Sequence, residues 1–130
     1  MIVEVATLEQ IMKELKIIQS EIEIELSEDI QQAIDRGNYC SAMLARTGKL
    51  LADAKIHKDR KLNSEVVTNL KKIIALPATT GNKFIDSLCH DENYIVNWCE
   101  RVNRSCTHQL DWCRTLISKA KAEMQAFNPQ

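Results

Sequence analysis

The chain has 130 residues, of which 45% are hydrophobic, and a net charge of −1. This length suits a single domain with its own core, and the near-neutral charge by itself indicates no particular partner. The chain has only three glycines, two prolines and 5% aromatic residues, a composition that excludes a turn-rich sheet protein and predicts nearly all-helical structure.

The number of cysteines and the hydropathy of the chain indicate the cellular compartment. Five cysteines are present, an odd number, and no charged-then-apolar leader precedes them. We therefore expect a protein of the reducing cytoplasm rather than a secreted disulfide framework. The longest apolar runs are only a few residues, so we expect no membrane-spanning segment and no membrane partner.

Charge is distributed unevenly along the chain. Residues 1–36 hold nine acidic and three basic residues, residues 37–72 hold eight basic and three acidic, and residues 73–130 hold six of each. The chain therefore has an acidic beginning, a basic middle and a balanced end.

The acidic segment, residues 7–36, is predicted to form two helices. Thr7 and Gln10 have the spacing of a capping box, and the residues before Thr7 are expected to form a short extended segment. Residues 21–26 alternate acidic and apolar side chains as a strand would, but their helical neighbours favour helix. Ser27 is expected to cap a second helix, which Gly37 ends. The first helix is expected to bury a stripe of apolar side chains spaced three and four residues apart: Leu8, Ile11, Met12, Leu15, Ile18 and Ile22.

The basic segment, residues 38–76, is predicted to form the middle helices. Asn38 is expected to cap a helix that runs to about Leu62, and residues 63–65 to cap another that ends before Pro77. Residues 78–82 contain two threonines and a glycine, which predict a loop where the chain reverses.

A long helix is predicted over residues 82–127, with a possible restart at residues 91–93. Three heptads align from Asn97 to Ile117, and an uninterrupted helix of this length would span about 60 Å. Its apolar face is wider than a dimer seam, which favours several neighbouring helices and an oligomer. The predicted oligomer interface comprises Ile95, Trp98, Cys99, Val102, Cys106, Trp112, Cys113 and Leu116.

Sequence motifs for catalysis and metal binding are absent. The chain has no glycine-rich phosphate loop, no HExxH, no CxxC and no nucleophile elbow. Cys89 and His90 are adjacent, but neighbouring residues on a helix point about 100° apart and do not converge. Cysteines seven apart lie roughly 10 Å from one another, too far for a disulfide or a shared metal within one chain. We therefore expect a protein without enzymatic activity, cofactor or metal.

The basic run is the main functional candidate. Clustered lysines and arginines bind phosphate backbones without demanding a particular base sequence. The simpler interpretation is a solvated helix face, because Asp53, Asp59 and Glu65 reduce the charge of the segment. Trp98 and Trp112 could also stack on bases, although their place in the heptads favours the core or an interface. The predicted nucleic-acid-binding residues are Lys55, Lys58, Arg60, Lys61, Lys71 and Lys72.

Three motifs in order along the chain resemble the UvsY family, the recombination mediators of T-even-like phages. They are LEQIMKELK near the N-terminus, IHKDRKL in the middle and the tryptophan- and cysteine-containing helix that closes in EMQAF. The basic motif resembles a helix in which a lysine and an arginine two apart contribute to single-stranded DNA binding, and these match Lys58 and Arg60. The chain departs from the family after this motif, where NSEVVTNLKKIIAL replaces an aromatic-rich segment.

The resemblance implies an all-helical homo-oligomer that binds single-stranded DNA. It further implies contacts with a recombinase and with the competing single-strand-binding protein, in the cytoplasm of a bacterium or a phage-infected cell. We thus expect an all-α, elongated helical bundle within a single domain, acting as a noncatalytic recombination mediator. The alternative is a helical adaptor or inhibitor, of a phage or bacterial conflict type, that recognises a protein and binds no nucleic acid.

Overall fold

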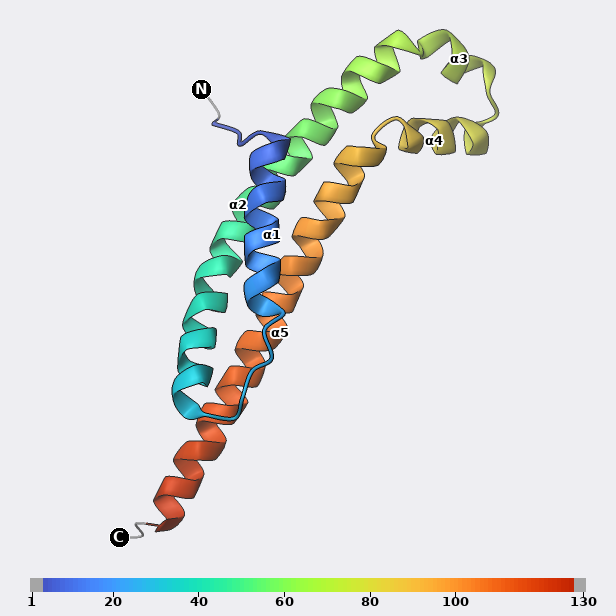
Figure 1. Cartoon of the computed structure of the whole chain (residues 1–130). Helices are drawn as coiled ribbons and strands as arrows, with labels where there is room; N and C mark the ends of the chain where they lie inside the picture. The colour runs from blue at the N-terminus through green and yellow to red at the C-terminus, as the bar shows by residue number, and fades with distance from the viewer. Residues whose placement is uncertain (1–3, 128–130) are drawn as a thin grey trace.

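The computed structural model describes residues 4–127, which form five helices and no strand (Figure 1). These helices are α1 (Leu8–Ile22), α2 (Ile30–Thr68), α3 (Leu70–Ala75), α4 (Ala78–Ser87) and α5 (His90–Phe127). The predicted all-α class and the long C-terminal helix are confirmed. Within the described residues, no helix is both long and apolar enough to cross a membrane.

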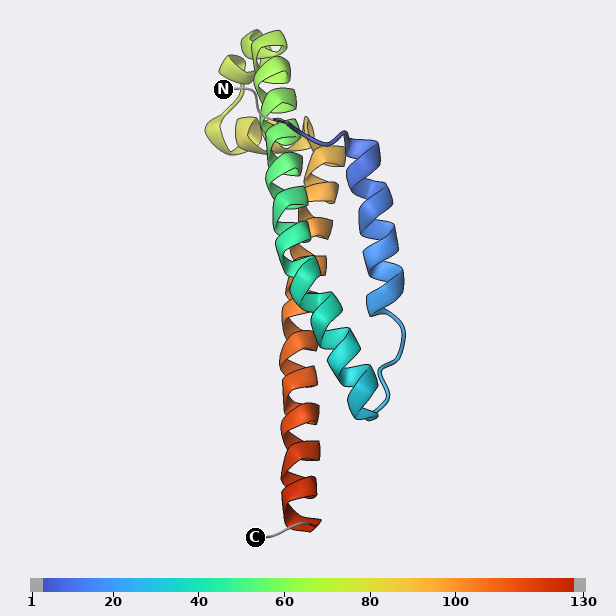
Figure 2. The ribbon, with the colours of Figure 1, turned by 90° about the vertical axis from the view of Figure 1, so that its left-hand side faces the viewer.

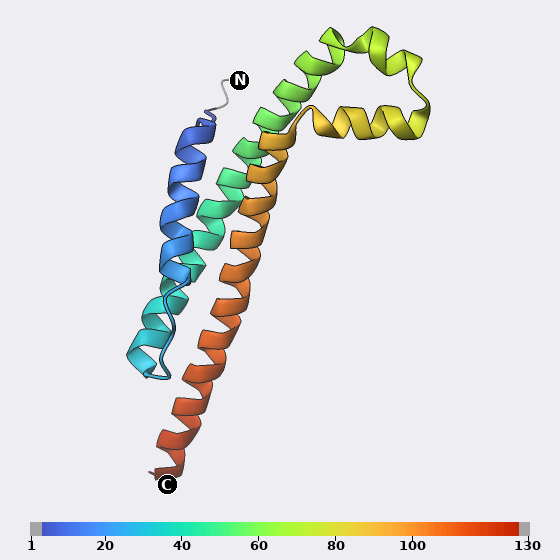
Figure 3. The same ribbon diagram turned by 45° about the vertical axis from the view of Figure 1, so that its right-hand side comes forward.

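The two long helices, α2 and α5, lie side by side and antiparallel, and α1 packs against both (Figures 1 and 2). Residues 59–88, here named the arm, comprise the end of α2 together with α3 and α4. The arm projects past the beginning of α1, whereas α5 extends past the other helices at its C-terminal end (Figure 3). The molecule is therefore an elongated three-helix bundle with a different extension at each end.

Helix α1 begins as the sequence predicts. The Thr7 hydroxyl accepts a hydrogen bond from the Gln10 amide at 3.1 Å, and the Gln10 side chain accepts one from the Thr7 amide at 2.9 Å, which completes the capping box. Ile11, Leu15 and Ile18 are buried. The predicted continuation of helix through residues 21–26 is wrong, because α1 ends at Ile22 and a non-helical link leads to α2.

Helix α2 is continuous where two interruptions were predicted. Asp29, rather than Ser27, is its N-cap and accepts a hydrogen bond from the Gln32 amide. The predicted stop at Gly37 is wrong for a packing reason, because a Cβ atom there would lie 3.4 Å from Cβ of Cys113. Gly37 thus allows α2 and α5 to approach closely. The predicted new cap at residues 63–65 is also wrong, since α2 runs on to Thr68.

The seam of α5 forms the core of a single chain. Cys99, Val102 and Cys106 are almost fully buried and belong to one cluster with residues from α1 and α2. Polar contacts lie in the same layer, because the Asn103 amide donates hydrogen bonds to the Leu44 carbonyl at 3.1 Å and to the Thr47 hydroxyl at 2.7 Å. The wide apolar face therefore finds its neighbouring helices within the chain.

The region around Pro77 differs from the prediction. Pro77 ends α3 as expected, but the predicted loop at residues 78–82 is wrong, since α4 begins immediately at Ala78. Proline fixes a φ that suits the start of a helix, and its φ here is −56°. The predicted helix over residues 82–127 is divided at Leu88 and Cys89, and α5 starts at His90, close to the possible restart at residues 91–93.

Candidate nucleic-acid interface

The six predicted DNA-binding residues lie at or beside the arm. Lys55 and Lys58 lie on α2 just before the arm, Arg60 and Lys61 follow at its beginning, and Lys71 and Lys72 lie on α3. All except Lys58 are exposed, and Lys58 is half-buried where its backbone carbonyl accepts a hydrogen bond from the Cys89 thiol at 3.7 Å. The fold thus gathers these bases at one end of the molecule (Figure 1).

Ion pairs neutralise part of the basic segment. Arg46 contacts Glu14 at 2.5 Å, Lys49 contacts Asp53 at 2.5 Å, and Lys61 contacts Glu65 at 3.4 Å. Among the residues that the structure describes, the other five bases of the segment have no ion pair. These five are Lys55, Lys58, Arg60, Lys71 and Lys72.

Helical geometry divides the bases of α2 between two sides. Residues three apart lie about 60° apart around a helix, so Lys55, Lys58 and Lys61 form a row that shifts by about 120° from its first member to its last. Arg60 is two residues from Lys58 and therefore points about 200° away from it around the helix. A single strand of DNA that contacts Lys58 and Arg60 together must cross α2 rather than follow one face.

The segment before α1 is fastened to α2 beside these bases. Asp53 accepts a hydrogen bond from the Ala6 amide at 3.1 Å, and His57 Nε2 lies 2.6 Å from the Ala6 carbonyl oxygen. Burial of Asp53 opposes its ionisation, but the hydrogen bonds from Lys49 and Ala6 outweigh burial and hold the pKa of this carboxyl below its ordinary value. Lys49 is therefore engaged by the Asp53 carboxylate and the Glu4 carbonyl oxygen, and its charge is partly neutralised.

The arm carries a further base that the sequence analysis did not select. Lys83 of α4 and Lys72 of α3 line the same open pocket at the corner between the two helices, which has a volume of about 630 Å³. Because residues 78–82 were predicted as a loop, the face of α4 that carries Lys83 was not recognised. The spacing of Thr80, Lys83 and Phe84, at positions i, i+3 and i+4, is the signal that would have found it.

The predicted interface residues lie mainly inside the single chain. Trp98 is half-buried and donates a hydrogen bond to the Gln19 side chain at 3.3 Å, whereas Trp112 is 51% exposed. A contact between copies would therefore have to use the exposed residues of α5 rather than most of its seam. The predicted interface residues that are buried in one chain are Ile95, Cys99, Val102, Cys106, Cys113 and Leu116.

The cysteines are buried and lack metal-site geometry. Burial raises the pKa of the Cys40 and Cys99 thiols to about 11. Burial also raises the pKa of the Cys89 thiol, and its neighbour His90 is exposed. No group of three or more histidine, cysteine or acidic residues suited to a metal ion occurs in the described part of the chain. These thiols are therefore packing residues in this fold.

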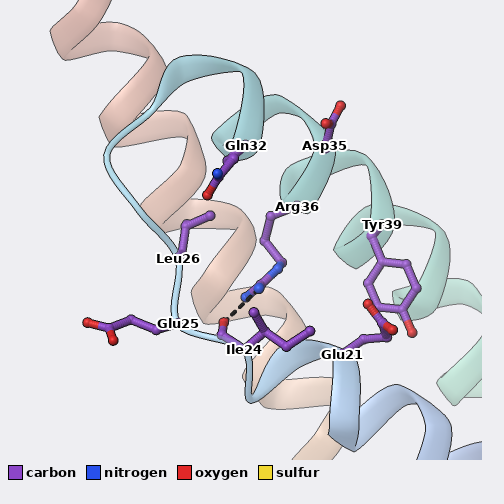
Figure 4. Close-up of a pocket in the computed structure, with 8 residues that line it drawn as sticks. All are labelled: Glu21, Ile24, Glu25, Leu26, Gln32, Asp35, Arg36 and Tyr39. Atoms are coloured by element: carbon purple, nitrogen blue, oxygen red, sulfur yellow. Dashed lines mark hydrogen bonds between the residues drawn. The ribbon is translucent and has the colours of Figure 1, made fainter.

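The opposite end of the bundle has an acidic pocket of about 230 Å³, formed by the end of α1, the link and the beginning of α2 (Figure 4). Glu21, Glu25 and Asp35 line it. Arg36 is the only base in this lining, and it turns inward to donate a hydrogen bond to the Ile24 carbonyl at 2.7 Å. Burial and the nearby Glu21 raise the pKa of the Tyr39 hydroxyl at its edge. This acidic pocket and the arm therefore lie at different ends of the bundle.

Comparisons of the chain with protein-family models, with curated proteins and with solved structures found no match.

Proposed function

We propose that the protein is a noncatalytic, single-stranded DNA-binding recombination mediator that helps to load a recombinase. One observation carries this proposal: in a chain of net charge −1, five bases of the middle segment lack an ion pair within the described residues and lie in the arm or in the turn of α2 just before it. Phosphates that contact these bases would release counterions from the DNA, which would supply affinity without base specificity.

The remaining parts of the proposal use other surfaces. The acidic pocket of Glu21, Glu25 and Asp35 has the charge to receive a basic surface of the recombinase or of the single-strand-binding protein. Copies of the chain would assemble through the end of α5, where Met124 and Phe127 are 63% and 86% exposed. Several arms in one oligomer would hold a strand more tightly than one arm, because later contacts become intramolecular.

A salt titration tests the DNA-binding step. We expect labelled oligothymidine to bind with an affinity that falls steeply with salt, as measured by fluorescence anisotropy. The double variant Lys58→Ala/Arg60→Ala should weaken binding several-fold and make the slope of log affinity against log salt shallower by about 1.4, at roughly 0.7 per lost phosphate contact. The matched control is Arg101→Ala/Arg104→Ala, which removes two exposed bases of α5 without an ion pair in the described residues. An equal loss of DNA affinity in both double variants would mean that the DNA does not bind specifically at Lys58 and Arg60.

A second candidate is the adaptor or inhibitor that binds no nucleic acid. An apolar groove of about 500 Å³ between the beginnings of α1 and α5 favours it, with Leu8, Met12 and Tyr94 in the lining and Glu9 and Asp91 beside them. Tyr94 is 63% exposed, as expected for a residue that a protein partner covers. The same titration separates the two candidates: absence of DNA binding at low salt would leave the adaptor and make the basic segment a solvated helix face.

A further inference from the structure

The corner between α3 and α4 brings two short helix faces together. Lys72 and Ala75 lie three residues apart on α3, with the extended Leu76 directly after them, and Thr80, Lys83 and Phe84 occupy positions i, i+3 and i+4 of α4. All six line the open pocket of about 630 Å³. This volume lies within the range of about 300–1,000 Å³ that is typical of small-molecule sites.

Three residues shape the corner. Only two residues with extended backbone, Leu76 and Pro77, separate the helices, which places the end of α3 beside the start of α4. Gly81 is buried, and a Cβ atom built on it would lie 3.8 Å from the Ile73 carbonyl oxygen and 3.9 Å from the Leu76 Cβ. The helices are thus held close behind the pocket, while Lys72 and Lys83 remain exposed in front.

The residues that line the pocket suit a ligand that is both flat and anionic. Leu76 and the half-buried ring of Phe84 form its apolar wall, Lys72 and Lys83 provide two positive charges, and no carboxylate lines the pocket. Aromatic rings bind nucleobases by stacking whatever the base sequence, and lysines beside them bind the flanking phosphates. The Thr80 hydroxyl adds a group that can donate or accept a hydrogen bond.

We infer that this corner pocket binds one unpaired nucleobase of a single strand, which stacks on Phe84 while Lys72 and Lys83 contact the neighbouring phosphates. The inference rests on the proposed function and adds a reason for strand selectivity. A base in a duplex is already stacked and paired, so its face is not available to Phe84 without a cost of unpairing. The phosphates of a duplex still meet the lysines, but the stacking contribution is lost.

The experiment compares oligothymidine with an abasic strand of the same length, which has the same phosphates and no bases. Phe84→Leu keeps an apolar side chain in the pocket and removes the ring. We expect wild type to bind oligothymidine more tightly than the abasic strand, and Phe84→Leu to lose roughly five-fold or more on oligothymidine alone. Lys72→Ala/Lys83→Ala should weaken both strands and make both salt slopes shallower by about 1.4.

Tyr94→Leu is the matched control, because it also replaces an aromatic ring by leucine, at a position of α5 that is 63% exposed and does not line the corner pocket. Circular dichroism of each variant checks that its helices are intact. If wild type binds both strands equally, or if an intact Phe84→Leu binds oligothymidine like wild type, the stacking site is overturned while DNA binding by the arm stands. If wild type binds neither strand, the proposed function falls together with the stacking site.

Discussion

The Arg36 guanidinium donates a hydrogen bond of 2.7 Å to the side-chain oxygen of Gln109 and so joins the beginning of α2 to the middle of α5. The Gln109 amide in turn donates to the Ile22 carbonyl at 2.8 Å, at the end of α1. Carbonyls at a helix end have no partner in the helix itself, so Gln109 satisfies one that would otherwise need water. One side chain therefore ties all three helices of the bundle together.

Gln109→Ala is expected to lower the free energy of unfolding by about 1–3 kcal/mol, because it leaves Arg36 and the Ile22 carbonyl without these hydrogen bonds. Urea unfolding followed by circular dichroism measures the change. Gln125→Ala is the control, since Gln125 is exposed near the end of α5 and should change the free energy by less than about 0.5 kcal/mol. Similar effects of the two substitutions would show that the hydrogen bonds of Gln109 add little stability.

The sequence predicts the all-α class and the long C-terminal helix but not such contacts between helices. The predicted apolar face of α5 is buried in the core cluster from Ile95 to Cys106, whereas Trp112 farther along the helix is 51% exposed. Periodicity does not reveal which helix covers the face, so a contact between residues as far apart as Arg36 and Gln109 cannot be read from it. The interface was predicted between chains for this reason, whereas α1 and α2 bury most of the seam within one chain.

The glycines of α2 show a second limit of local patterns. Gly37 has the appearance of a helix stop, but it lies within α2 where Cys113 approaches. Gly48 lies in the same helix, and no atom lies within 4 Å of a Cβ built on it. Local sequence therefore cannot distinguish a glycine required for packing from one that only weakens the helix.

Gly48→Ala is expected to raise the free energy of unfolding by about 1 kcal/mol, because alanine favours helix over glycine and meets no neighbour at this position. Gly37→Ala should raise the free energy of unfolding clearly less, because its new methyl group would lie 3.4 Å from the Cys113 Cβ. Thermal unfolding of the two variants in parallel measures the difference. A gain from Gly37→Ala equal to that from Gly48→Ala would contradict the close approach of α2 and α5.

The arm was the least predictable region, and its packing gives the reason. Within residues 59–88, all of which the structure describes, Gly81 is the only buried residue. Apolar side chains such as Leu62, Val66 and Phe84 are half-buried, and Val67 and Ile74 are about 75% exposed. Few buried contacts mean weak tertiary constraint, so capping and turn signals at residues 63–65 and 78–82 were a poor guide to the helices that form there.

Hydrogen exchange should distinguish the arm from the bundle. We expect amides of α3, α4 and the last turns of α2 to exchange much faster than those near Leu50 and Cys99, because opening the arm exposes little buried apolar surface. Mass spectrometry of peptic peptides measures these rates. Helix α2 provides an internal control, because its first half packs on α1 and α5 whereas its end, in the arm, does not. Equal protection along α2 would mean that the arm is as stable as the bundle.

The buried thiols make the stability of the fold depend on pH in the alkaline range. The pKa of Cys40 and Cys99 is about 11 in the folded chain, above the ordinary thiol value of 9.0, because burial disfavours the thiolate. Unfolded thiols therefore release protons at a lower pH than folded ones. The stability that these neutral thiols contribute is fully present below pH 9.0 and is lost as the pH rises toward about 11.

Unfolding free energies measured by urea at several values of pH test this dependence. We expect the free energy of unfolding to fall between pH 9.0 and pH 11, and Cys99→Ala to reduce the slope by up to about 1.4 kcal/mol per pH unit. Other groups titrate in this range, so the difference between wild type and variant isolates the contribution of Cys99.

At neutral pH, a thiol reagent should modify the folded chain slowly and the urea-unfolded chain at all five cysteines. Rapid modification of the folded chain would contradict the burial of the seam.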